Sequence, residues 1–169
     1  MKQTKLKTIA VVSACMMGML SSSAQGVMQR TANYYPDGRG FSCVNGNNRY
    51  TRALYGSVDE WRLETSDRPI FAIFKKNNHR NIRFVIKCNG QAFQLDSVEY
   101  CKARYEAGKR EYLMKDKRWG SGVLKLSVLA YPQTEGAVWK FAAENFGKAK
   151  IEIVGMICET RRSEERRVG

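Results

Sequence analysis

The feature that most constrains this fold is a succession of short apolar runs that alternate with Asn, Gly, Asp and Pro turn signals. From residue 41 onward these runs recur at a spacing of roughly 8 to 12 residues, which is typical of antiparallel sandwiches and barrels. About ten strands are expected, and this number favours two packed sheets over a small closed barrel. The sequence therefore predicts an all-β fold, an antiparallel two-sheet β-sandwich with little helix.

Two Asn-Gly turns predict hairpins, because Asn and Gly accept the positive φ angles of a tight turn. The first, Asn-Gly-Asn-Asn at 45–48, lies between the strand-like runs 41–44 and 49–55. The second, Asn89-Gly90, follows the apolar run 82–88. Each turn is expected to join the two runs beside it as neighbouring antiparallel strands.

Three further regions complete the expected sheet pattern. The run 70–74 (IFAIF) is continuously apolar and predicts a core strand. Residues 98–105 predict a strand in which neither face is cleanly apolar, so its inward face stays undecided. A final pair of strands is expected at 137–142 and 149–154.

The N-terminus has the order of a secretory signal peptide: a basic start, an apolar stretch at 8–20 and a small-residue exit. The apolar stretch is too short to span a bilayer as a helix. We expect a signal peptide at 1–24, a β-sandwich domain at 25–160, and an exported, periplasmic or extracellular protein. Lipidation at Cys15 is the less favoured alternative, because it would leave an apolar segment at the start of the mature chain.

The last nine residues, 161–169, carry six charges and one large apolar side chain, so they cannot add to a core. They predict a solvated, disordered tail. The tail is similar to a translated adapter sequence that recurs at the ends of unrelated chains, and a natural basic tail is the alternative.

The net charge of +13 suggests a nucleic-acid partner at first sight. Without the signal peptide and the tail, 22 basic and 14 acidic residues remain, a net charge of +8. These basic residues are spread over most of the predicted strands, and the chain is expected to be exported. We therefore predict no nucleic-acid partner and no membrane span.

Four cysteines remain after the signal peptide: Cys43, Cys88, Cys101 and Cys158. An exported chain can form disulfides, and Cys88 with Cys101 is the first pair to test because the two flank one hairpin-like stretch. Buried free thiols are an equally good interpretation. No close Cys pair exists and His79, in a polar turn, is the single histidine, so neither a zinc site nor a catalytic histidine is expected.

Glycoside hydrolysis would require two carboxylates, one of them with a raised pKa. The carboxylates of the body lie among Arg and Lys, which predicts surface ion pairs with lowered pKa values. The sequence therefore predicts no catalytic residue and no cofactor. The carboxylates considered are Asp59, Glu60, Glu64, Asp67, Glu106 and Glu111.

Aromatic residues offer the clearest ligand candidates. Trp119 in a loop is the best residue for stacking on a sugar, with Tyr50 and Arg52 as companions. The competing interpretation is that Trp119 covers the edge of the sandwich, while Trp61 and Trp139 belong to the core. A third possibility, a polyanion binder, would use Arg49, Arg52, Lys117 and Arg118.

Three stretches, 48–56 (NRYTRALYG), 68–72 (RPIFA) and 103–108 (ARYEAG), resemble a bacterial domain of unknown function, family 4450. The resemblance covers roughly residues 34–156. It implies a non-catalytic β-sandwich at the N-terminus of a long exported protein, packed on a downstream barrel similar to six-hairpin glycosidases. Catalytic acids would then belong to the barrel, so none is carried over. An oligosaccharide is a further implied partner, and an independent carbohydrate-binding module is the alternative.

Overall fold

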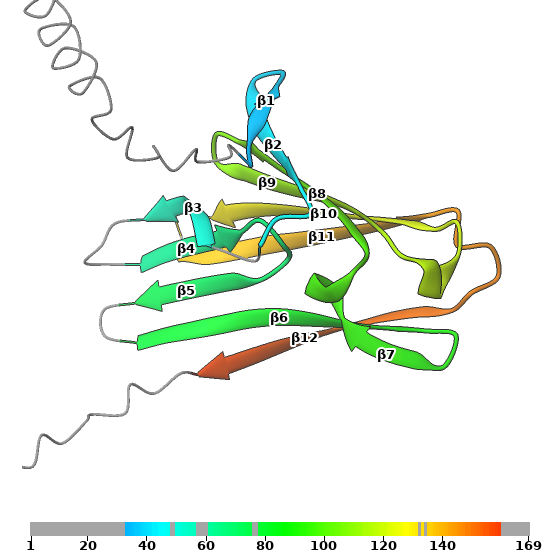
Figure 1. Cartoon of the computed structure of the whole chain (residues 1–169). Coiled ribbons are helices and arrows are strands. Elements are labelled where there is room, and N and C mark those ends of the chain that lie inside the picture. The colour runs from blue at the N-terminus through cyan, green and yellow to red at the C-terminus, as the bar shows by residue number, and fades with distance from the viewer. Residues whose placement is uncertain are drawn as a thin grey trace, which may run out of the picture. The chain divides into compact units, whose positions relative to one another are not determined.

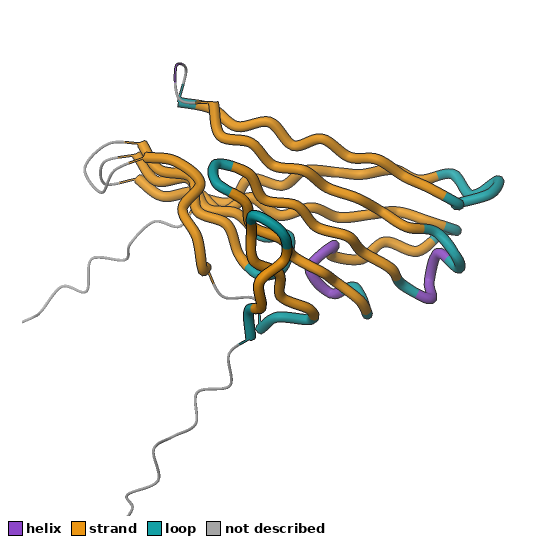
Figure 2. Tube along the Cα trace, turned by 90° about the horizontal axis from the view of Figure 1, so that it is seen from above, coloured by secondary structure: helices purple, strands orange, loops and turns teal. Residues whose placement is uncertain are grey.

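The computed structural model describes residues 33–47, 50–56, 61–75, 78–131, 133 and 135–159. It has an all-β architecture of twelve strands in two antiparallel sheets (Figure 1), where the sequence predicted about ten strands. Helix is confined to short 3-10 turns, and the strands make up most of the described chain (Figure 2). The expected signal peptide and tail lie outside the described residues.

Sheet A has the strand order β1-β2-β8-β9-β10-β11. Its strands are β1 (Tyr35–Asp37), β2 (Gly40–Val44), β8 (Tyr100–Glu106), β9 (Lys109–Lys115), β10 (Val123–Tyr131) and β11 (Gly136–Glu144). Sheet B has the order β12-β6-β5-β4-β3, and β7 pairs with the second half of β6. Its strands are β3 (Tyr50–Gly56), β4 (Trp61–Ser66), β5 (Phe71–Lys75), β6 (Asn78–Cys88), β7 (Gln91–Gln94) and β12 (Ile151–Glu159).

The core lies between the two sheets. Phe71 of β5 contacts Tyr112 of β9 and Trp139 of β11 edge-on, with ring centroids 5.8 Å apart in both pairs. Phe84 of β6 contacts Phe141 of β11 in the same way at 5.1 Å. Because these contacts all join one sheet to the other, the sheets pack face to face, and the predicted two-sheet β-sandwich is confirmed.

The hairpin predicted between 41–44 and 49–55 is wrong. β2 pairs with β1 and β8 in sheet A, whereas β3 pairs with β4 in sheet B. Asn45 has a positive φ, but its backbone N–H donates to the carbonyl oxygen of Cys101, which continues the pairing with β8. The Asn-Gly segment therefore belongs to a crossing from one sheet to the other.

The other local predictions are confirmed. Asn89 and Gly90 both have positive φ and close the β6–β7 hairpin. The run 70–74 coincides with most of β5, in which Phe71 is fully buried. The undecided strand, β8, turns Cys101 and Ala103 inward, because both are fully buried.

The final two predicted strands form, but they do not pair with each other. β11 pairs with β10 in sheet A, and β12 pairs with β6 in sheet B. Phe146, in the connection between them, packs against Trp119 with ring centroids 5.7 Å apart. The chain therefore changes sheet here for the third time, after β2–β3 and β7–β8.

One strong cation is buried in this core. Arg110 of β9 is 0% exposed, and its Nη2 donates to the carbonyl oxygen of Ser66 and to Tyr34 Oη, each at 3.0 Å. Tyr112 Oη donates to the same Ser66 oxygen at 2.7 Å. Polar groups buried between apolar layers require such partners, so this network fixes β9 against the end of β4.

Candidate functional site

The outer face of sheet A carries a group of charged and polar side chains that are joined by ion pairs. In β8, β9 and β10 every second side chain is buried in the core, and the side chains between them point outward. The strand register aligns the outward residues in two rows, because each lies opposite its neighbours on the adjacent strands. One row is Lys102, Leu113 and Lys125; the other is Arg104, Glu111 and Ser127.

A shallow hollow of about 230 Å³ lies over these two rows. Leu113 gives it one apolar wall, and the remaining outward residues supply cations, a carboxylate and a hydroxyl. A binding site needs a concave surface with a few placed polar groups. This hollow is therefore our candidate functional site.

The carboxylates at the site are held in ion pairs. Glu111 lies 3.1 Å from Arg104 Nη1 and 2.5 Å from Lys109 Nζ. Hydrogen bonds from Lys109 and then from Arg104 lower the pKa of Glu111. A carboxylate with a lowered pKa stays ionised at neutral pH and cannot serve as a general acid. The prediction of an ion-paired Glu111 is confirmed.

A second carboxylate, Asp37 of β1, borders the same face. Hydrogen bonds from Ser42 and from Lys102 lower its pKa. Lys102 Nζ lies 2.9 Å from Asp37 Oδ2, and on the far side of the hollow Lys125 Nζ lies 2.7 Å from Glu144 Oε1. The cations of the site are thus balanced by nearby carboxylates, an arrangement suited to binding a polar ligand by paired donors and acceptors.

An exposed apolar patch adjoins the hollow along β10. Leu129 is 47% exposed and lies directly opposite Val138 of β11, which is 54% exposed. Tyr131 follows on the same face of β10 and is 48% exposed. We call these three residues the β10–β11 patch. Neighbouring exposed apolar side chains on an otherwise charged face are a sign of an interaction surface.

A larger hollow of about 370 Å³ lies where the β6–β7 turn meets the connection into β12. Its walls include Lys87, Lys148 and Lys150, and Lys87 Nζ lies 3.4 Å from Glu152. The lysines of this hollow are exposed and its one ion pair is long, so the hollow over sheet A is the better defined site.

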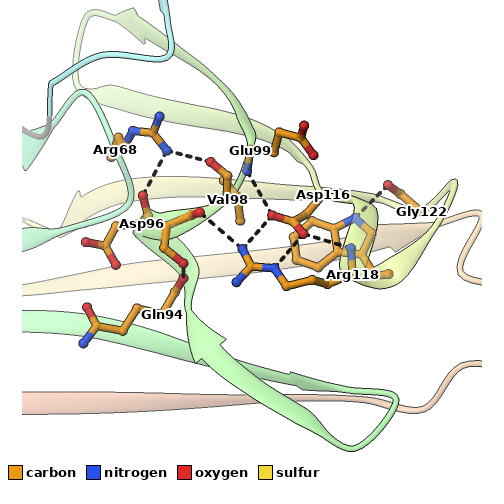
Figure 3. A network of polar contacts seen from close by, with 10 residues as sticks. Arg68, Gln94, Asp96, Val98, Glu99, Asp116, Arg118 and Gly122 are labelled. Carbon is orange, nitrogen blue, oxygen red and sulfur yellow. Dashed lines mark hydrogen bonds and ion pairs between the residues drawn. The ribbon is translucent and has the colours of Figure 1, made fainter.

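Trp119 is not a surface residue. Its side chain is 3% exposed, its ring stacks on Phe93 at 5.8 Å, and Phe146 packs against it. Its Nε1 donates to the carbonyl oxygen of Gly122 at 3.0 Å (Figure 3). The indole is covered by protein and offers no surface to a sugar in this structure. The stacking role expected for Trp119 is therefore corrected to a packing role, as in the competing interpretation.

The companions proposed for Trp119 do not join it in a described site. Tyr50 and Arg52 belong to β3, where their backbones lie opposite Ser66 and Thr65 of sheet B. Their side chains, like all of Arg49, are outside what the structure describes. Trp119 follows β9 of sheet A in a 3-10 turn, η2 (Lys117–Trp119).

Arg118 is held in an ion pair and is not a free surface cation. Its guanidinium donates to both oxygens of Asp116, Nε to Oδ1 at 2.7 Å and Nη2 to Oδ2 at 2.6 Å (Figure 3). The same guanidinium lies 3.4 Å from the ring centroid of Phe93. Asp116 also accepts the backbone N–H of Glu99 at 2.9 Å. The polyanion interpretation thus loses one of its four cations.

Arg68 makes a similar clasp on the neighbouring loop (Figure 3). Its Nη1 donates to the carbonyl oxygens of Asp96 and Val98, at 3.0 and 2.8 Å, and its Nε donates to that of Gly46. This arginine therefore ties the segment between β2 and β3 to the one between β7 and β8.

Stability should depend on pH through Asp116. Hydrogen bonds from Arg118 lower the pKa of Asp116 to about 2, against an ordinary 3.8. Because the pKa is lower in the folded state, the ionised carboxylate stabilises the protein by about 2 kcal/mol above pH 4. This stabilisation is lost as the pH falls from about 4 to about 2. Asp116→Asn should therefore be less stable than the native chain at pH 6 and nearly equal to it near pH 2. Urea unfolding at both pH values measures this.

The control for Asp116 is Glu144→Gln, which breaks the exposed pair with Lys125. Exposed pairs contribute little, about 0–1 kcal/mol. If Asp116→Asn lowered the free energy of unfolding by the same amount at pH 6 and near pH 2, the role given to the ionised carboxylate would be contradicted.

The proposed Cys88–Cys101 disulfide is not present. Cys43, Cys88 and Cys101 are buried free thiols, and Cys158 is an exposed free thiol. Cys88 ends β6 in sheet B, whereas Cys101 lies in β8 of sheet A, so the two do not flank one hairpin. Burial raises the pKa of the Cys101 thiol to about 12, which keeps it protonated.

The remaining sequence candidates have ordinary structural roles. His79 lies in β6 rather than in a turn, and it stacks on Phe74 at 5.1 Å. Glu64 pairs with Arg62 at 2.8 Å. Asp67 is buried and accepts the backbone N–H of Asn47 at 2.9 Å, while Asp59 and Glu60 lie outside the described residues. Within the described ranges, no group of three His, Cys, Asp or Glu residues could hold a metal ion.

Sequence reasoning missed the hollow over sheet A. Its residues come from three strands, and each is an ordinary outward residue by itself. The signal was the mixed pattern of β8, where Lys102 and Arg104 share the face opposite Cys101. Only the register shows that these cations meet Glu111 and Ser127.

The fold and this face define the class: an antiparallel β-sandwich module with a polar outer sheet. Residues 78–158, from β6 into β12, match the model of a family described as a domain of unknown function, DUF4450. This match confirms the family resemblance over residues 78–158, which include the stretch 103–108, whereas the stretches 48–56 and 68–72 lie outside the matched range. No curated protein and no solved structure matches the chain. None of the helices in the described ranges has the length and apolar character needed to cross a membrane.

Proposed function

We propose that this chain is a non-catalytic N-terminal β-sandwich module of an exported, glycoside-hydrolase-like protein that processes carbohydrate. The observation that carries the proposal is the outer face of sheet A, where the exposed β10–β11 patch adjoins an ion-paired hollow. An apolar patch on one sheet is what a module that packs on a partner domain requires. The export and the carbohydrate context rest on the N-terminal sequence and on the family resemblance.

The pKa values of the carboxylates on this face favour a structural role for the module over a catalytic one. Hydrolysis of a glycosidic bond needs one carboxyl group that is protonated at working pH and a second that is ionised. Glu111 and Asp37, two carboxylates on this face, both have lowered pKa values because cations or hydroxyls donate to them. In the proposed arrangement the catalytic acids belong to a downstream barrel domain.

The β10–β11 patch is the proposed contact with that downstream domain. Leu129 and Val138 lie side by side on neighbouring strands, so one flat apolar surface can cover both. Burying such a side chain contributes about 1.5–3 kcal/mol. The hollow beside the patch would then form one wall of a cleft between the two domains, which is a common place for a ligand.

The alternative is an independent carbohydrate-binding module, and the hollow itself favours it. In this hollow Lys125 provides an ammonium donor and Ser127 a hydroxyl group. Leu113 provides an apolar surface beside them. Tyr131 nearby has an exposed ring that a pyranose could cover. This alternative places the sugar on sheet A, away from Trp119.

The test uses a clone in which the coding sequence beyond codon 169 is read and expressed. We expect a barrel domain there, and the double variant Leu129→Lys, Val138→Lys should weaken its contact with the sandwich. Loss of two buried apolar side chains predicts at least a tenfold weaker association of the separately produced domains. Isothermal titration calorimetry measures it.

The matched control is Ile157→Lys, which charges an exposed apolar residue of sheet B, away from the hollow and the β10–β11 patch. It should leave the association unchanged. Equal weakening by the control, or no association between the domains, would contradict the docking role. Retardation of the isolated chain by a polysaccharide in affinity electrophoresis, abolished by Lys125→Ala with Ser127→Ala, would establish the alternative in its place.

A further inference from the structure

Strand β12 is a long, regular edge of sheet B in the described part of the chain. It pairs with β6 through nine consecutive positions, from Ile151 opposite Cys88 to Glu159 opposite Arg80, with no bulge. β12 is the last strand of sheet B, and no described strand pairs with its other side (Figure 1). Its outer backbone groups therefore form a regular template for another strand.

The other four edge strands have features that disfavour strand addition and that β12 lacks, and one of them, β7, has only four residues. β1 has three residues and contains Pro36, and β3 has two register irregularities against β4. β11 carries exposed Lys140 and Glu144. β12 contains no Pro, Lys or Arg, and its charges, Glu152 and Glu159, lie near its two ends. Proteins usually block strand addition with such devices, so their absence from β12 marks it as an edge that accepts a strand.

The side chains of β12 support the same conclusion. Ile157 lies opposite Ile82, on the inner face of sheet B. Ile82 is buried at 6% exposure, yet Ile157 is 68% exposed. The covering sheet therefore protects β6 and leaves the inner side of β12 open at Ile157, whereas Ile151 and Ile153 pack against the core. A strand added to β12 would bring a side chain next to Ile157.

We propose that β12 pairs antiparallel with β12 of a second copy of this chain, about a two-fold axis at Gly155. Opposed residues in a sheet share a face, and a register centred on Gly155 is the one that pairs all nine residues of each strand. Isologous pairing of this kind joins the two copies of sheet B into one continuous sheet.

The sequence of β12 is complementary to itself in this register. Ile157 of one copy lies opposite Ile153 of the other on the inner face, and Val154 lies opposite Met156 on the outer face. Glu152 lies opposite Cys158 of the second copy, so no two carboxylates are opposed. The central residue has no side chain, and a Cβ there would lie 3.3 Å from Phe84. The apolar side chains in the middle of β12 are thereby covered by the same side chains of the second copy. This self-complementarity is the reason for choosing a second copy as the partner of β12.

A cysteine cross-link tests the register. In Glu152→Cys, the new thiol lies opposite Cys158 of the second copy, within about 4.5–5.5 Å between Cβ atoms. Mild oxidation should convert this variant to a covalent dimer on non-reducing gels. The native chain should not cross-link, because its two Cys158 residues lie six positions out of register, about 20 Å apart. Adding Cys158→Ser to the variant should abolish the cross-link.

Light scattering after size exclusion tests the association itself. The native chain should have twice the molar mass of one copy, and Val154→Lys with Ile157→Lys should return it to that of one copy. Val138→Lys, on the other sheet, should leave the dimer intact, which separates this proposal from the docking role of the β10–β11 patch. A monomeric native chain, cross-linking of native Cys158 to itself, or no cross-link in Glu152→Cys would overturn the proposal.

Discussion

Replacing Trp119 by alanine is expected to lower the free energy of unfolding by about 3–5 kcal/mol, the usual loss for a buried tryptophan. The indole fills the space between Phe93 and Phe146, and its Nε1 is bonded to Gly122. Truncation leaves a cavity in a region where side chains from two sheet connections meet. Denaturant unfolding measures the loss.

Trp119→Phe is the matched control, because it keeps an aromatic ring and removes only part of the volume and the hydrogen bond. We expect a smaller loss of stability for it, about 1–2 kcal/mol. A Trp119→Ala variant with unchanged stability that loses only polysaccharide retention would contradict the packing role. It would restore the sugar-stacking role that the sequence suggested.

Phe71→Ala should have a comparable effect, a loss of about 3–5 kcal/mol in the free energy of unfolding. Phe71 is fully buried, and its ring contacts Phe84, Tyr112 and Trp139, which belong to three other strands. Aromatic edge contacts add about 0.5–1.5 kcal/mol beyond the buried area. We expect a loss near the upper end of the range, measured by urea unfolding.

Phe74, in the same strand, provides the control for Phe71. It lies on the opposite face of β5, partly exposed, between the Arg62 guanidinium and the His79 ring. Phe74→Ala should cost clearly less, because part of this side chain is already in water. Equal losses at Phe71 and Phe74 would show that the contacts between the sheets do not dominate the stability.

Local chemistry predicted the local structure well. Asn89 and Gly90 accept positive φ angles, and the hairpin that they predicted is present. The same chemistry at Asn45 and Gly46 led to a wrong hairpin. Turn residues predict that the chain turns. They do not predict which sheet the next strand joins, because that depends on strands far away in the sequence. Here Asn45 donates its backbone N–H to the carbonyl oxygen of Cys101, and its side-chain Oδ1 accepts the backbone N–H of Cys101.

The sequence also did not predict which polar and aromatic side chains are buried. A single tryptophan between Arg118 and Gly120 has the pattern of a surface loop, and Phe146, which covers it, lies far along the chain. Arg110 is a cation, a residue type that is rarely fully buried, yet its side chain is 0% exposed and bonded to Ser66. In both cases the decisive contacts come from residues far apart in sequence.

The sequence by itself determined the all-β class, the spacing of most strands and the family resemblance, because hydrophobic alternation and turn chemistry are local properties. Only the tertiary structure decided that β2 and β3, and β11 and β12, divide between two sheets. It also decided which outward residues meet in the hollow and that β12 remains an open edge. Those features depend on strand order and register, and pairing between distant strands sets both.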